Sequence, residues 1–194
     1  MLNFREVEIA DAPMILKWRR SVRVTSQMVN DVPNDLVAHV RWISSVPTNP
    51  TYYHWIYGTS EQAIGLASIS QLDMNNHSTS WGYYVGDENS VGIGAWVPPY
   101  MYNWLFGLVG IKKIHAEVLA TNRGVLKMHS FHGYRRQPTR DRTIRKNGKC
   151  HELVALELNA ATWHKFTRLQ HYRTDFPVSG WLAGPESLKS AQSL

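Results

Sequence analysis

Alternating apolar and polar residues along the chain predict a protein rich in β-strands. Apolar residues at helical spacing between them predict four helices, of which one starts near the cap residue Asp11 and another near Asn34 or Asp35. The predicted strands span residues 4–9, 52–57, 63–69, 80–85, 113–119 and 152–158, with another from Tyr134. The predicted helices span residues 14–19, 36–44, 95–106 and 123–132.

This order of elements favours an α/β fold with a mixed, mostly antiparallel sheet and flanking helices. Residues 1–160 carry the whole pattern and are predicted to form one domain. Residues 161–194 mix aromatic and polar side chains with prolines and glycines. We therefore expect them to form a C-terminal tail of limited regular structure.

The composition of the 194 residues is that of an ordinary globular protein, with 43% hydrophobic residues. No apolar run approaches the length that spans a bilayer, and the first residues do not resemble a secretory leader. Cys150 is the only cysteine, which excludes an intrachain disulfide and a cysteine-rich metal site. We expect a cytoplasmic protein with no bound metal and no membrane partner.

The chain carries a formal charge of +6, from 21 basic and 15 acidic residues. Such an excess favours anionic partners. The densest basic run, residues 135–146, reads as a solvated hairpin or loop, and it lacks the interleaved aromatics of a nucleic-acid surface. We expect no nucleic-acid partner, because phosphates on a cofactor or on a nucleotide-linked substrate account for the same charge.

A glycine-rich turn follows the strand at 80–85, with Asn89, Gly92 and Gly94 spaced along it. A strand that leads through such a turn into a helix presents free backbone N–H groups, which bind phosphate well. Pro98 and Pro99 follow, so the regular helix is expected to begin late or with a distorted first turn. The turn predicts a cofactor that contains pyrophosphate.

With this element order in place, residues 1–160 resemble the GNAT superfamily of N-acetyltransferases. The family pattern at the turn is matched by Asn89, Gly92 and Gly94, with Asn in place of a longer Gln or Arg. A second pattern is matched by Asn122, Val125 and His129, and it closes with Gly133-Tyr134. The resemblance implies the GNAT fold, whose central strands splay apart to admit the cofactor.

The resemblance also implies acetyl-coenzyme A (acetyl-CoA) as the cofactor and a direct transfer of its acetyl group. The end of the strand at 80–85 would bind the pantetheine arm, the glycine turn would bind the pyrophosphate, and Asn122 would bind the arm or cap its helix. The implied cofactor-binding residues are Val85, Asn89, Gly92, Ile93, Gly94, Ala95, Asn122 and Val125.

His129 stands where the family usually has the tyrosine that protonates the departing thiolate, so the resemblance implies that role for it. His132 is a weaker competitor. Ser80 replaces a glutamate that serves many relatives as a base, and a hydroxyl alone is too weak. His54 is the first choice for the base, with a water-mediated route as an alternative; the other candidates are Asp73, His77, His115 and Glu117.

A narrower resemblance lies in residues 16–20, which contain a Trp-Arg pair. It points to the acetyltransferases of bacterial nucleotide-sugar pathways, including the one in pseudaminic acid synthesis, and implies UDP-4-amino-4,6-dideoxy-N-acetyl-altrosamine as the acceptor. The acceptor-binding candidates are Trp18, Arg19, Arg23 and Tyr83. Two alternatives remain open: acetylation of a protein N-terminus, and a non-catalytic module that binds coenzyme A or nucleic acid. The protein is expected to be a monomer or a homodimer.

Overall fold

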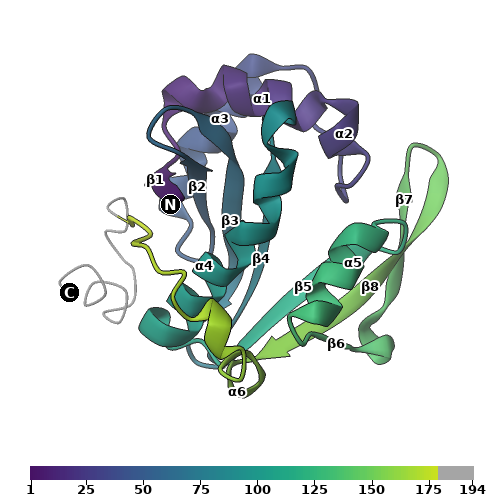
Figure 1. The fold of residues 1–194 in the computed structure, drawn as a ribbon. Helices are drawn as coiled ribbons and strands as arrows, with labels where there is room; N and C mark the ends of the chain where they lie inside the picture. The colour runs from purple at the N-terminus through teal and green to yellow at the C-terminus, as the bar shows by residue number, and fades with distance from the viewer. Residues whose placement is uncertain (179–194) are drawn as a thin grey trace.

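Eight strands form one sheet in the computed structural model of the chain, which describes residues 1–178 (Figure 1). The strands run in the order β1-β2-β3-β4-β5-β8-β6, and β7 pairs with β8. Their bounds are β1 Asn3–Glu6, β2 Tyr53–Gly58, β3 Ala63–Asp73, β4 Ser78–Val85, β5 Lys113–Leu119, β6 Arg135–Arg136, β7 Arg142–Lys146 and β8 Lys149–Asn159.

Helices cover both faces of this sheet (Figure 1). α1 and α3 pack on one face of the β2–β4 half through Ile15, Trp18 and Ile43, and α4 packs on the opposite face. The α-helices are α1 Ala12–Arg20, α2 Val22–Thr25, α3 Leu36–Ser45, α4 Val97–Trp104, α5 Arg123–Phe131 and α6 Ala160–Trp163. Short 3-10 helices span Ile9–Asp11, Val46–Thr48, Glu88–Trp96, Pro138–Arg140 and Thr167–Leu169, and a π-helical turn spans Leu105–Val109.

The predicted fold class is confirmed, including the splayed central strands. Every strand pair is antiparallel except β4 with β5, which pair in parallel only from Ser78 to Ser80 and from Lys113 to His115. Beyond Ser80 the two strands diverge, which leaves an opening between the halves of the sheet (Figure 1). None of the helices among residues 1–178 is long and apolar enough to cross a membrane.

The glycine turn differs from the sequence pattern, whereas the basic run forms a hairpin, which is one of its two predicted structures. The glycine turn is itself helical, because Glu88–Trp96 winds as a 3-10 helix before α4 begins at Val97 with a proline in its first turn. The late start that the prolines predicted is therefore confirmed. The basic run contains the strand β7, which forms a hairpin with β8; its turn residues Asn147 and Gly148 both have positive φ, as a tight two-residue hairpin requires.

The two faces of the β2–β4 half differ in side-chain size. One row across the sheet joins Trp55, Ala67 and Tyr83 on the face that α4 covers. The neighbouring row joins His54, Ser68 and Gly82 on the opposite face. Because Ser68 and Gly82 are small, this row leaves space above the sheet, whereas the aromatic row fills the core.

Residues 160–178 pack onto the same core. Asn103 of α4 anchors them, because its Nδ2 donates to the carbonyls of Leu169 and Tyr172, both at 2.8 Å, and its Oδ1 accepts from Trp163 Nε1 at 2.7 Å. Farther along, Trp55 Nε1 donates to the Pro177 carbonyl at 2.7 Å. The predicted domain boundary at residue 160 stays a prediction, and residues 179–194 of the predicted tail lie outside the described residues.

We expect Asn103→Ala to reduce the free energy of unfolding by about 2–4 kcal/mol, because it leaves a buried indole N–H and two carbonyls without partners. Urea unfolding measures the loss, and Asn3→Ala at an exposed position of β1 is the control. A loss no larger than that of the control would show that Asn103 does not hold the segment.

Candidate functional site

The divergence of β4 and β5 opens into a cavity of about 980 Å³. Both halves of the sheet line it, with residues 81–85 on one side and residues 116–119 on the other. Among the described residues, the edge of β4 beyond Ser80 has no strand partner on the β5 side. An extended ligand with amide groups can pair with such an edge as an added strand.

The glycine-rich 3-10 segment packs against the end of β4 at this opening. A Cβ on Gly94 would lie 2.7 Å from Cγ2 of Val85, so glycine is needed for the close approach. A Cβ on Gly92 would meet no heavy atom within 4 Å, so packing within the protein does not require glycine there. The bare backbone at Gly92 leaves room for a ligand to approach, which fits a pyrophosphate.

The predicted cofactor residues fall into two groups. Those that line the cavity are Val85, Gly94, Ala95, Asn122 and Val125. Those that lie on the same 3-10 segment but outside the cavity are Asn89, Gly92 and Ile93. Asn122 caps α5, since its Oδ1 accepts from the backbone N–H of Val125 at 3.3 Å. Its side-chain N–H₂ has no partner within residues 1–178 and is available to a ligand.

His129 lies on the buried face of α5 and contributes to the cavity wall. Its Nδ1 is buried with no hydrogen-bond partner, which leaves Nε2 as the nitrogen that can face the cavity. Burial, with a smaller contribution from His132, lowers the pKa of His129 to about 4. The imidazole is therefore uncharged at neutral pH, and its unprotonated nitrogen can accept a hydrogen bond there.

Aromatic side chains of β4 hold the helix that carries His129. Trp81 donates from Nε1 to the Tyr134 hydroxyl at 2.9 Å, and the Tyr134 ring lies 4.3 Å from that of His129. Tyr83 stacks on Trp81 and donates to Met128 Sδ at 3.4 Å. Tyr83, predicted to bind the acceptor, thus lies in the cavity wall and contacts α5.

The other end of the cavity is an aromatic chamber, formed by His39, Trp42, Tyr52, His54 and Tyr84. The His54 ring lies 5.0 Å from Trp42 and 4.3 Å from Tyr52, and burial lowers its pKa to about 3. Three buried atoms here have no hydrogen-bond partner: His39 Nε2, His54 Nδ1 and the Tyr84 hydroxyl. Such groups are costly inside a protein, so their concentration in one chamber indicates a site for a polar ligand.

The three remaining residues predicted to bind the acceptor lie near this chamber. Arg19 is in the wall, with its guanidinium 6.0 Å from the centre of the Tyr84 ring. Arg23 lines the cavity but uses both terminal nitrogens to donate to the carbonyls of Val85 and Gly86, each at 2.8 Å. Trp18 is packed into the core beneath Gly86 and does not line the cavity.

His54 and His129, both predicted from the sequence as site residues, line the same cavity. The other four residues of the chamber were not predicted. His39 and Trp42 fall on the helix predicted at 36–44, and a three-residue spacing on a helix is the signal that could have paired them. Tyr52 directly precedes β2 and Tyr84 lies on β4, and no local pattern in the sequence relates them.

Comparison with known proteins agrees with this geometry. The family model described as an acetyltransferase (GNAT) domain matches residues 4–154. No curated protein sequence matches the chain.

Solved structures share the fold at low sequence identity. A spermidine N-acetyltransferase from Vibrio cholerae, in complex with CoA and spermine, has a TM-score of 0.74 at 12% identity, covering 84% of this chain and 98% of its own. A putative acetyltransferase has a TM-score of 0.70 at 13% identity, covering 87% of this chain and 88% of its own.

The buried histidines predict a loss of stability in acid. His54 and His129 have folded-state pKa values of about 3 and 4, below the unfolded value of about 6.5, so the unfolded chain binds protons first. The free energy of unfolding should therefore fall as the pH drops from about 6.5 toward 4. Melting temperatures measured across that range should fall less steeply for His129→Phe than for the wild type. Exposed His164→Phe is the control, and an equal slope in all three proteins would contradict the prediction.

Proposed function

This chain belongs to the GNAT acetyltransferase family, and on that premise we propose that it acetylates the amino group of a nucleotide-linked amino sugar, UDP-4-amino-4,6-dideoxy-N-acetyl-altrosamine. The family makes it an N-acetyltransferase that uses acetyl-CoA. The acceptor is the proposed part. The observation that carries it is the aromatic chamber, with its unpartnered buried polar atoms and Arg19 in its wall.

Acetyl-CoA supplies an acetyl group activated as a thioester. The residues present fit it, because the free edge of β4 suits the amide-containing pantetheine arm and the open backbone at Gly92 suits the pyrophosphate. Asn122 would donate its free side-chain N–H to the arm. Unpaired N–H groups on β4 would hydrogen-bond the thioester oxygen and stabilise the negative charge that develops on it.

The aromatic chamber matches the chemistry of a nucleotide-linked sugar. Flat aromatic walls such as Trp42 and Tyr52 suit stacking on a nucleobase or a sugar face. Arg19 supplies a cation for a phosphate. His39 and His54 offer buried ring nitrogens that a hydroxyl or an amide can satisfy. An acceptor that carries a nucleobase or a sugar face, a phosphate, and hydroxyl or amide groups would match the chamber. Its polar groups would give the unpartnered atoms hydrogen bonds and so offset the energetic cost of burying them.

The carboxylates of the cavity argue against a polyamine, which the structural neighbour from Vibrio cholerae binds. A polycation needs free carboxylates. Here Asp31 pairs with Lys146, Asp35 caps α3 through the Ala38 N–H, and Glu117 pairs with Arg142. The acids in the wall are therefore already engaged, while Arg19 disfavours a cation.

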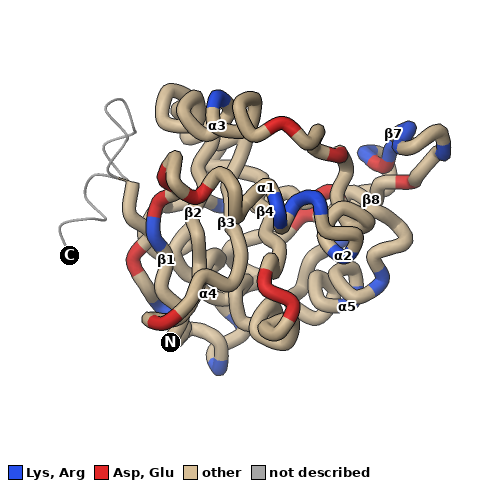
Figure 2. Tube along the Cα trace, turned by 90° about the horizontal axis from the view of Figure 1, so that it is seen from above, with Lys and Arg blue, Asp and Glu red and all other residues tan. Residues whose placement is uncertain are grey.

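A protein N-terminus is the second candidate acceptor, because GNAT enzymes that acetylate protein N-termini share much of the sequence resemblance. An extended peptide needs an open groove. Lys146 of β7 contacts Thr25, Met28 and Asp31, and we propose that these contacts leave too little room at the acceptor end for an extended peptide. The family match itself disfavours the non-catalytic alternative. Basic residues of β7 (Figure 2) are also paired, since Arg142 contacts Glu117 and Lys146 contacts Asp31.

His129 is the proposed catalytic residue. Because it is uncharged at neutral pH, it cannot act as an acid until it gains a proton. We assign to it both proton transfers of the reaction. Nε2 takes the proton from the attacking nitrogen and then gives it to the departing sulfur. His54, the base expected from the sequence, has the lower pKa and is the weaker base, so it suits holding the acceptor in the chamber.

His129→Phe should lower kcat by about 10²-fold or more, because it removes the proton carrier and keeps a ring of similar size. The KM for acetyl-CoA should change little. His129→Tyr, which installs the usual residue of the family, should retain more activity than His129→Phe. Steady-state kinetics of thiol release give both values, and melting temperatures show whether each variant is folded. A folded His129→Phe variant with wild-type kcat would exclude the role.

The acceptor is tested by thiol release from acetyl-CoA with a panel of UDP-linked amino sugars, N-terminal peptides and spermidine. We expect saturable turnover with a UDP-linked 4-amino sugar and much weaker turnover with the others. Turnover of peptides or spermidine in preference to every sugar would overturn the proposed acceptor. His54→Phe and His39→Phe should raise the acceptor KM and leave the acetyl-CoA KM near the wild-type value.

A further inference from the structure

The loop of residues 26–34 between α2 and α3 forms part of the cavity wall. Every residue from Gln27 to Pro33 lines the cavity. None of residues 26–34 is fully buried, and the loop has no regular secondary structure. With so little apolar surface buried, polar contacts must decide where this loop lies.

Contacts from its own half of the molecule hold one side of the loop. Arg19 donates to the backbone carbonyl and side chain of Asn30, at 3.2 and 3.0 Å. Arg20 donates to the Val32 carbonyl at 3.4 Å. These contacts come from the end of α1, on the same side of the opening as the loop. They do not connect it to the β5–β8 half.

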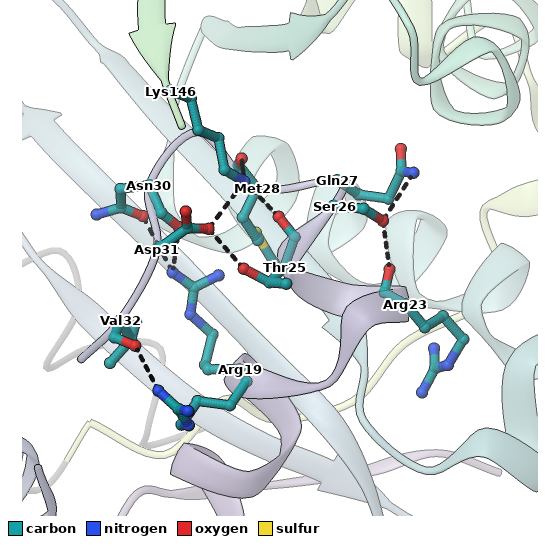
Figure 3. Close-up of polar contacts among 11 residues, drawn as sticks. Arg19, Arg23, Thr25, Ser26, Gln27, Met28, Asn30, Asp31, Val32 and Lys146 are labelled. Atoms are coloured by element: carbon teal, nitrogen blue, oxygen red, sulfur yellow. Dashed lines mark hydrogen bonds and ion pairs between the residues drawn. The ribbon is translucent and has the colours of Figure 1, made fainter. Parts of the chain in front are cut away.

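Within residues 1–178, the polar contacts that join the loop to the other half come from the β7–β8 hairpin: most are made by Lys146, and Asn147 adds a side-chain hydrogen bond to Asp31. Lys146, at the end of β7, donates from Nζ to the carbonyls of Thr25 and Met28 and lies 3.0 Å from the Asp31 carboxylate (Figure 3). Asp31 also accepts from the Thr25 hydroxyl at 2.6 Å. The Lys146 side chain is only 8% exposed. A buried ammonium is stable only when its donors are satisfied, and three partners satisfy this one.

We infer that Lys146 is a positioning residue for the acceptor: it fixes the 26–34 loop across the open end of the splay, and so sets the width of the acceptor end of the cavity. The predicted effect of Lys146 on acceptor binding rests on the proposed function, whereas its predicted effect on the position of the loop does not. Lys146 itself does not line the cavity, so it acts through Met28 and Asp31, which do.

Loss of Lys146 should therefore weaken acceptor binding and spare both chemistry and cofactor binding. In Lys146→Met the acceptor KM should rise about tenfold, the scale of losing charge-assisted hydrogen bonds, while kcat and the acetyl-CoA KM stay within about twofold. Lys146→Arg, which keeps the charge and the donors, should recover part of the loss. Lys149→Met is the matched control, because Lys149 is exposed and directly opposite Lys146 in the hairpin.

Hydrogen exchange of the protein without ligands gives a second measurement. Amides of residues 26–34 should exchange about tenfold faster in Lys146→Met than in Lys149→Met, with no change in β2 and β3. If Lys146→Met fails to fold, Asp31→Asn removes the ion pair alone and should shift exchange in the same direction. Equal exchange in the Lys146 and Lys149 variants, or an acceptor KM unchanged by loss of Lys146, would overturn the inference.

These measurements separate the two proposals. The kinetic test uses the UDP-linked 4-amino sugar as acceptor. If the wild-type enzyme does not turn it over, the proposed function fails, while the exchange data still decide whether Lys146 holds the loop. If the sugar is turned over and the Lys146→Met variant has wild-type KM and exchange, only the inference about Lys146 fails.

Discussion

The short parallel pairing of β4 with β5 is the constraint on which the rest of this structure depends. Three residues on each strand pair, and beyond them the sheet divides into two halves. The division creates the cavity and leaves the edge of β4 free for a ligand. It also removes the ladder of hydrogen bonds that would join the halves, so side chains replace it: Trp81 with Tyr134 on one face, and Lys146 with residues 25–31 on the other.

Burial of imidazoles is the second theme of the site. His39, His54 and His129 each have a ring nitrogen that is hidden from water and has no partner within the described chain. Their pKa values are lowered by that burial, which keeps the rings uncharged at neutral pH. The folded protein accepts an energetic cost there that a bound ligand can offset. An uncharged ring nitrogen can accept or donate a hydrogen bond, so these histidines suit a polar ligand.

Much of the fold was predictable because it depends on local patterns. Period-two runs located the strands, and Pro98 and Pro99 forecast the late start of α4. Motif spacing placed Asn122 and His129 on one helix beside the cavity. The rest depends on contacts between distant residues. No local pattern shows that Trp18 packs beneath Gly86, or that Lys146 meets Thr25 from 121 positions away. The basic run was predicted to be a hairpin or a loop, and the structure shows the hairpin, with its turn at Asn147-Gly148.

The packing of the C-terminal segment has a consequence for synthesis of the protein on the ribosome. Phe4, in the first strand, packs against Phe176, with ring centroids 4.3 Å apart, and Val178 belongs to the same core. A nascent chain that has released only the residues matched by the family model, 4–154, still lacks these side chains and Trp163. The apolar surface of its first strand stays exposed until residue 178 has left the exit tunnel. The core of the described residues is therefore complete only after Trp163, Phe176 and Val178 have been released.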